Sequence, residues 1–137
     1  MKQIATGAVA GLVATAAMTA VMTSLFRLLP RRDRYPLPPV EIVSRLIGRR
    51  ASPAVSLLAH FAYGALTGAL WGRLRTARLA AGAAYGLAVW GASYLGWLPA
   101  LGILKPATRH PPARNALMLL AHLAWGATLA AATRRLK

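Results

Sequence analysis

Four long stretches of the chain contain no charged residue, and short basic segments separate them. The uncharged stretches cover residues 4–26, 51–72, 79–104 and 115–133. Each is close to the roughly 20 apolar residues that a helix needs to cross a hydrocarbon core of about 30 Å. The pattern predicts an all-α, polytopic membrane protein with a single domain, residues 1–137. Its four transmembrane helices are expected at about residues 4–29, 53–72, 79–104 and 115–133.

The segment between the first two predicted spans has the pattern of an amphipathic helix over about residues 39–50. Apolar positions recur there with helical spacing, and Glu41 and Arg45 form an i,i+4 pair on the opposite face. A short basic amphipathic helix beside two spans is typical of the lipid headgroup region, where arginines meet anionic phosphates. The arginines expected to contact headgroups are Arg31, Arg32, Arg34, Arg45, Arg49, Arg50, Arg109 and Arg114.

Two phrases of the sequence occur twice. LLAHFAYGA at 57–65 returns as LLAHLAWGA at 119–127, and GAVAGL at 7–12 resembles GAAYGL at 82–87. The first predicted span therefore matches the third, and the second matches the fourth. A repeated two-helix unit keeps its orientation, so we expect a four-helix bundle with a pseudo-twofold axis along the membrane normal.

Glycines recur at four-residue spacing in the predicted spans, which places them on single helix faces. Small residues let membrane helices approach closely and gain van der Waals contact, as a glycine zipper does. The glycines expected to pack helices are Gly7, Gly11, Gly64, Gly68, Gly72, Gly82, Gly86 and Gly126.

The composition agrees with this reading and narrows the function. Lys and Arg number 17 against 2 Asp and Glu, but the charges lie in the loops, which argues against nucleic acid and for membrane lipid. The chain has no cysteine, and the spans have no Asp or Glu, so no thiolate site or intramembrane carboxylate pair is available. We expect no enzymatic activity and no cofactor.

The loops expected on the side away from the termini carry more Lys and Arg than the loop and ends on the other side, which favours both termini outside the cytoplasm.

The repeated phrase gives each half of the chain one histidine inside a span. His60 and His122 each lie about seven residues from a helix start, which is roughly 10 Å beneath the same surface. Polar residues in spans usually face the bundle interior. The polar layer expected at this depth contains His60, His122, Thr19, Thr23, Tyr94, Met18 and Met22.

Three interpretations of this layer stay open. The histidines could be neutral and hydrogen-bonded, and so hold the helices together. They could be the two axial ligands of haem b, with Gly64 and Gly126 leaving room for the macrocycle. They could also belong to a pathway for a soft metal or small solute, because Met18 and Met22 supply thioethers on one face. No residue spacing forms a metal-binding motif.

The segments YPLPPVEIV (35–43), SYLGWLPALGI (93–103) and RHPPARNALMLLAHLAWGA (109–127) resemble a group of small four-helix bacterial inner-membrane proteins, distantly similar to the YagU type. The resemblance implies a bacterial inner-membrane location and supplies no catalytic residues. We therefore expect a structural or accessory membrane component that binds anionic phospholipid and itself or another membrane protein. The alternative is a haem b, metal or small-solute module at the histidine pair.

Overall fold

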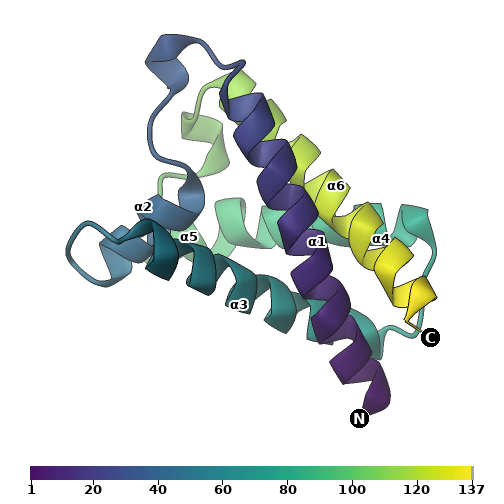
Figure 1. Ribbon diagram of the computed structural model, residues 1–137. Helices are drawn as coiled ribbons and strands as arrows, with labels where there is room; N and C mark the ends of the chain where they lie inside the picture. The colour runs from purple at the N-terminus through teal and green to yellow at the C-terminus, as the bar shows by residue number, and fades with distance from the viewer. Residues whose placement is uncertain (137) are drawn as a thin grey trace.

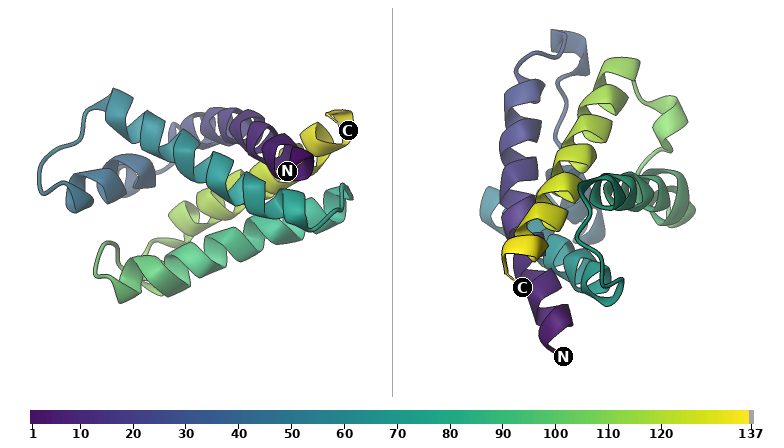
Figure 2. Two further views of the ribbon diagram at one scale, coloured as in Figure 1. Left: turned by 90° about the horizontal axis from the view of Figure 1, so that it is seen from below. Right: turned by 90° about the vertical axis from the view of Figure 1, so that its right-hand side faces the viewer.

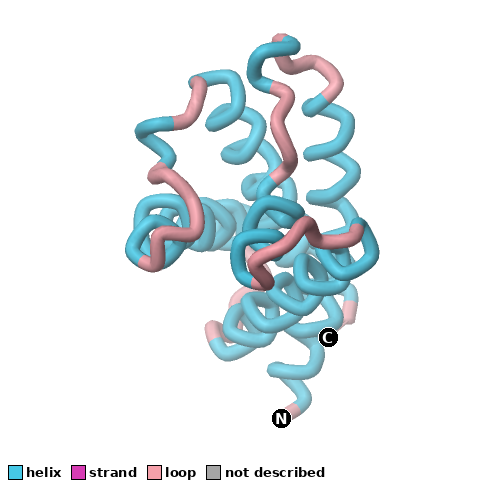
Figure 3. Tube along the Cα trace, turned by 90° about the vertical axis from the view of Figure 1, so that its left-hand side faces the viewer, coloured by secondary structure: helices cyan, strands magenta, loops and turns pink. Residues whose placement is uncertain are grey.

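The computed structural model describes residues 1–136, which form helices joined by loops and contain no strand (Figure 1, Figure 3). Three helices are long and apolar enough to cross a membrane: α1 (Lys2–Phe26), α3 (Pro53–Arg73) and α6 (Pro112–Arg135). Large hydrophobic side chains stay exposed along them, including Leu12, Leu66 and Leu120. Such a surface suits lipid better than water, and this indicates an all-α membrane protein.

The helix starts follow from local chemistry. Ser52 caps α3, where its side chain accepts a hydrogen bond from the Val55 amide at 3.3 Å. Pro53 and Pro112 stand at the first positions of α3 and α6, where a missing N–H group removes no helical hydrogen bond. Helix α3 therefore begins at residue 53, as predicted. Helix α6 is longer at both ends than the predicted span 115–133.

The predicted helix at 79–104 is not one regular α-helix. It consists of α4 (Leu79–Gly91), a π-helical segment η2 (Ala92–Trp97) and a single α-turn α5 (Leu98–Ala100). Two residues explain the break: Gly96 adopts φ −109° and ψ −107°, and Pro99 has no amide to donate to the preceding turn. The helical run ends before Gly102, whose φ of +67° favours glycine.

The predicted amphipathic helix is shorter than expected. It is α2 (Pro38–Leu46) and does not reach residue 50, because Gly48 turns the chain with φ +67°. Helix α2 packs against α3. Two short 3-10 turns, η1 (Arg31–Asp33) and η3 (Ala107–Arg109), complete the loops at the far end from the termini.

The helices are arranged around α1 and α6, which run side by side in opposite directions (Figure 1). Helix α3 packs on α1, and α4 packs on α6. Figure 2 shows α3 and α4 diverging from their connecting loop at 74–78, with α2 at the open end between them. The N- and C-terminal ends of the described chain lie at the same end of the molecule as that loop.

Candidate functional site

A cavity of about 230 Å³ lies where α3 and α4 diverge. All the major helices contribute to its wall, and α2 covers it with Pro39, Ile42 and Val43. Most of the wall is apolar. The apolar face of α2 is therefore turned inward toward the other helices.

Both predicted histidines line this cavity, His60 from α3 and His122 from α6. His122 is 7% exposed, and its Nδ1 lies 2.8 Å from the Met118 carbonyl oxygen. A carbonyl can only accept, so Nδ1 carries the proton and the neutral ring leaves a lone pair on Nε2. The neutral state follows from the apolar surroundings, where an unpaired imidazolium would be strongly disfavoured.

Two polar atoms of the cavity wall are buried without a hydrogen-bond partner among the described residues: Nε2 of His60 and the hydroxyl of Tyr94. Tyr94 is 5% exposed and belongs to the π-helical segment η2. Its ring packs edge-on against His122, with centroids 6.5 Å apart. Unpaired buried polar groups are rare, and π-helical turns often occur at functional sites.

The remaining polar side chains of the wall are satisfied within the protein. Thr15 donates to the Gly11 carbonyl at 2.8 Å and accepts from the Trp125 indole at 3.1 Å. Ser93 donates to the Val89 carbonyl at 2.8 Å, so the Tyr63 hydroxyl at 3.1 Å donates to Ser93. The unpaired polar atoms of the wall residues are therefore His60 Nε2 and the Tyr94 hydroxyl, and both are enclosed by protein.

The other predicted members of the polar layer divide into two groups. Met18 and Met22 are buried and line the cavity with Tyr94 and the histidines. Thr19 and Thr23 do not line it. Their hydroxyls donate to carbonyls four residues earlier in α1, and Thr23 is exposed, so these two predictions are wrong.

Sequence reasoning missed several wall residues: Thr15, Ser93, Met118 and Trp125. A signal existed for Met118, which lies one helical turn before His122, and for Trp125, nearly one turn after it. Thr15 gave a signal too, because it lies one turn before Met18 and Thr19. The inward position of Ser93 depends on the π-helical segment and gave none.

The glycines predicted to pack helices lie at the two closest helix contacts. A Cβ placed on Gly68 of α3 would lie 2.7 Å from the Cα of Gly11 in α1. A Cβ on Gly126 of α6 would lie 2.8 Å from the carbonyl carbon of Gly82 in α4. Both distances are too short for a real side chain, so larger residues would push these backbones apart. The remaining predicted glycines lie in the same two helix contacts. Gly7, Gly64 and Gly72 lie between α1 and α3, and Gly86 lies between α4 and α6.

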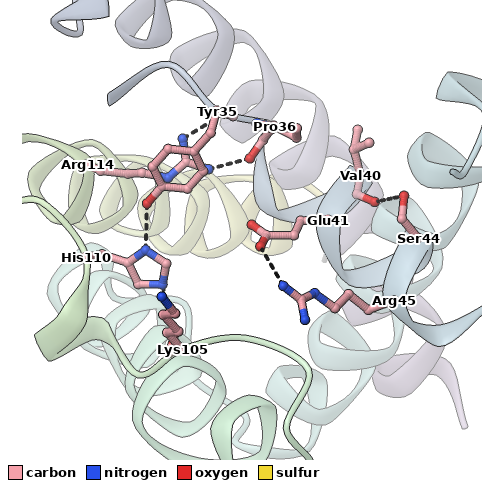
Figure 4. Close-up of polar contacts among 9 residues, drawn as sticks. All are labelled: Tyr35, Pro36, Val40, Glu41, Ser44, Arg45, Lys105, His110 and Arg114. Carbon is pink, nitrogen blue, oxygen red and sulfur yellow. Dashed lines mark hydrogen bonds and ion pairs between the residues drawn. The ribbon is translucent and has the colours of Figure 1, made fainter. Parts of the chain in front are cut away.

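The prediction that Arg114 contacts lipid headgroups is wrong, because its side chain is only 3% exposed. Its guanidinium donates to three backbone carbonyls of the loop after α1: that of Asp33 and, as Figure 4 shows, those of Tyr35 and Pro36. It also lies 3.5 Å from the ring centroid of Tyr35, a cation–π contact. Arg114 therefore fastens this loop to the start of α6.

Arg34 also bonds to the protein itself, since it donates to the carbonyls of Leu29 at 2.8 Å and Arg27 at 2.6 Å, beyond the end of α1. The other predicted headgroup arginines are exposed, although Arg45 approaches Glu41 at 3.9 Å. These exposed arginines are Arg31, Arg32, Arg45, Arg49, Arg50 and Arg109.

A second contact joins the two loops at this end of the molecule. Nε2 of His110 lies 3.1 Å from the Lys105 carbonyl and must donate to it, so Nδ1 accepts from the Tyr35 hydroxyl at 2.6 Å (Figure 4). Burial raises the pKa of Tyr35, and the nearby Arg114 charge opposes that rise. Tyr35 and His110 are 75 residues apart, which is the offset between GAVAGL at 7–12 and GAAYGL at 82–87.

Comparison with known proteins gives a family but no relative of known function. The model of a family described as "Family of unknown function (DUF6789)" matches residues 1–137, and the chain belongs to that family. No curated protein and no solved structure matches the chain. These comparisons show no link to the YagU type.

Proposed function

We propose that this family member is a small multi-pass membrane protein with an accessory role, and that its cavity holds a small, largely apolar molecule. The observation that carries this proposal is the cavity of about 230 Å³ whose wall is apolar apart from a few polar groups. Ligand sites are typically concave and apolar, with a small number of polar groups that orient the ligand. Nε2 of His122, whose Nδ1 is bonded to the Met118 carbonyl, supplies such a group here.

The proposal includes four membrane crossings, the third made by α4, η2 and α5 together. The helical run from Leu79 to Ala100 has a kink at Gly96, and at 1.5 Å per residue its length along the chain is about 30 Å. That length matches the hydrocarbon core. A π-helical turn is acceptable within a crossing when it lies against protein, and Ser93 and Tyr94 in this turn are buried.

We also propose that the bundle arose from a duplicated helix pair with a pseudo-twofold axis along the membrane normal. Gly11 meets Gly64 and Gly68 across the α1–α3 contact, and Gly86 meets Gly126 across the α4–α6 contact. The contact between Tyr35 and His110 supports the same idea, because equivalent residues touch each other only near a twofold axis.

The exposed loop arginines are proposed to bind anionic phospholipid in a bacterial inner membrane, with both termini outside the cytoplasm. Arg45, Arg49 and Arg50 are exposed on α2 and the loop after it, and among the described residues only Arg45 has a carboxylate nearby, that of Glu41 at 3.9 Å. The glycine faces are occupied by contacts within the chain. Association with a second copy or another membrane protein would therefore use exposed leucine surfaces instead.

The haem b alternative has less support than an organic ligand. Gly64 and Gly126 were expected to leave room for a macrocycle, but each of them contacts a neighbouring helix closely. A soft metal at the thioethers of Met18 and Met22 with the histidines is the remaining alternative, since these side chains share the cavity. Visible absorption and metal content of the purified protein separate both alternatives from an organic ligand.

The test of cavity binding uses bromooctane, whose bromine quenches the fluorescence of tryptophans that it reaches. Trp97 and Trp125 line the cavity, so we expect saturable quenching of the protein in lipid nanodiscs. Val89→Phe fills the cavity from α4 and should remove the saturable component, because Val89 forms part of the wall. Leu87→Phe is the matched control on the exposed side of the same helix. Equal, unsaturable quenching of wild type and both variants would refute the proposal.

A further inference from the structure

A second concave surface, which we call the arginine groove, lies on the side of α2 opposite the cavity. Its volume is about 840 Å³, within the range of about 300–1,000 Å³ that is typical of ligand sites. Arg45, Arg49 and Arg50 all line it. Tyr35 and Pro53 line it as well, so the groove forms where the loop after α1, helix α2 and the start of α3 meet.

A turn after α2 brings the three arginines to one groove. Gly48 has a φ of +67°, a conformation that favours glycine, and it reverses the chain there. The Ser44 hydroxyl donates to the Val40 carbonyl at 2.6 Å (Figure 4) and accepts from the Ala51 amide at 3.0 Å. These two bonds tie the loop that carries the last two arginines back to α2. The groove is therefore built by the fold and does not depend on long side chains meeting by chance.

The groove carries positive charge that the protein does not neutralise. Glu41 also lines it, and its carboxylate lies 3.9 Å from the Arg45 guanidinium. Neither Arg49 nor Arg50 has a carboxylate within ion-pair distance in the part of the chain that the structure describes. Three arginines against one glutamate leave two positive charges in the groove. An anionic group with two negative charges matches it.

The surroundings of the groove favour a lipid over a soluble anion. Leu46 and Ile47 follow Arg45 directly in the sequence, and they are 62% and 42% exposed. Exposed apolar side chains beside arginines are typical of a helix that lies in the headgroup region of a membrane. The groove also touches the first residue of α3, a helix long and apolar enough to cross a membrane. Basic pockets at such positions bind lipid headgroups that carry several negative charges.

Two phosphates match the groove better than one. A guanidinium binds a phosphate through two parallel N–H bonds, so each of the two arginines without a carboxylate can bind its own phosphate. A single phosphodiester has one negative charge and would leave half of the net charge unmatched. A phosphate monoester has up to about two negative charges, but they lie on one phosphorus centre. The volume of about 840 Å³ accommodates a larger headgroup with two centres.

Resting on the proposed binding of anionic phospholipid, we propose that the arginine groove is a site for a phospholipid whose headgroup contains two phosphates. Arg49 and Arg50 each bind one phosphate, while Leu46 and Ile47 lie against the acyl chains. Ser44 is a positioning residue, because its hydroxyl is bonded to two backbone groups and holds the loop in place.

The test measures lipid binding to the detergent-solubilised protein by native mass spectrometry. The probes are cardiolipin with two phosphodiesters, phosphatidylglycerol with one phosphodiester and phosphatidic acid with one phosphate monoester. We expect the dissociation constant of cardiolipin to be about ten-fold lower than that of either other lipid. Equal affinity for cardiolipin and a one-phosphate lipid would overturn the two-phosphate assignment and leave the binding of anionic phospholipid intact. The absence of binding by all three lipids would overturn both. Displacement of cardiolipin by an equal concentration of inorganic pyrophosphate would overturn the assignment to a lipid.

Two double variants locate the site and separate it from the effects of overall charge and of the four acyl chains of cardiolipin. Arg49→Gln with Arg50→Gln should raise the dissociation constant of cardiolipin about ten-fold, to that of phosphatidylglycerol. Arg31→Gln with Arg109→Gln is the matched control, since it removes the same charge from exposed arginines outside the groove. The control should keep the preference for cardiolipin. Equal losses in the two double variants would overturn the groove as the site.

A third variant tests the positioning role without changing any charge. Ser44→Ala releases the loop from α2 and should reduce the preference for cardiolipin several-fold, with the affinity for phosphatidylglycerol unchanged. A full preference for cardiolipin in this variant would overturn the role of Ser44.

Discussion

At the residue scale, Arg114 shows how a charge in this protein is used for structure. Its guanidinium lies at the start of α6, with three loop carbonyls on its N–H groups and the Tyr35 ring against its face. Carbonyl dipoles and an aromatic quadrupole stabilise the cation without a carboxylate partner. The loop after α1 is consequently fixed, and α2 follows from it toward the cavity.

We predict that Arg114→Met destabilises the protein by about 2–4 kcal/mol, because three loop carbonyls lose a charged donor. The apolar stem is largely kept by Met, so the loss reflects hydrogen bonds more than packing. Thermal unfolding in detergent measures the change. Arg109→Met is the control, since Arg109 is exposed, and should shift stability by no more than about 0.5 kcal/mol. Similar stabilities of the two variants would contradict this role of Arg114.

The sequence allowed some of these residues to be assigned and not others. His60 and His122 were recognisable because each interrupts an apolar run and the phrase around it is repeated. Arg114 was assigned to lipid because it stands in a basic segment next to a span. Its burial depends on a loop about 80 residues earlier in the chain, and no local pattern reports such a contact.

At the element scale, helix positions followed from hydrophobic runs and from prolines at helix starts. The break in the run at 79–104 did not follow, although Gly96 and Pro99 both stand at it. An isolated glycine or proline is common in membrane helices, and a π-helical turn leaves the apolar composition unchanged. Hydropathy therefore could not indicate that Ser93 and Tyr94 would both turn inward.

The helix contacts themselves lead to a second prediction. Gly68→Leu should destabilise the protein by about 2–3 kcal/mol, because a Cβ at this position would lie 2.7 Å from Gly11 Cα and force α1 and α3 apart. Leu66→Ala, two residues away on the exposed side of α3, should change stability by less than about 0.5 kcal/mol. Thermal stability in detergent is the measurement. Equal effects of the two changes would mean that the glycine face does not hold the helices together.

At the scale of the whole molecule, the two halves are arranged differently despite their similar sequences. Helix α1 packs along α6, whereas α3 and α4 diverge and are bridged by long side chains. Tyr63 reaches Ser93 across this gap, and Tyr85 donates to the Thr67 carbonyl at 2.7 Å. The cavity exists because of this divergence, and α2, which has no counterpart in the second half, covers it. Repeat analysis alone predicts a symmetric bundle and so could not reveal a cavity on one side.

The number of membrane crossings determines whether the two ends of the chain lie on the same side of the membrane. Four crossings place Lys2 and Leu136 on the same side of the membrane, whereas three crossings place them on opposite sides. The structure has three regular helices long enough to cross, so the broken run from α4 to α5 decides the outcome. We expect it to cross, because its length matches the hydrocarbon core and both ends of the described chain lie beside the loop at 74–78.

The chain contains no cysteine, so single cysteines can be introduced without a background. Lys2→Cys, Arg75→Cys and Leu136→Cys should react with a membrane-impermeant thiol reagent from one side of sealed vesicles. Arg50→Cys and Lys105→Cys should react only from the other side. If Lys105→Cys reacts with the first group and Leu136→Cys with the second, the run from α4 to α5 does not cross the membrane. The cavity that it lines would then lie at the membrane surface, and its ligand would have to enter from water.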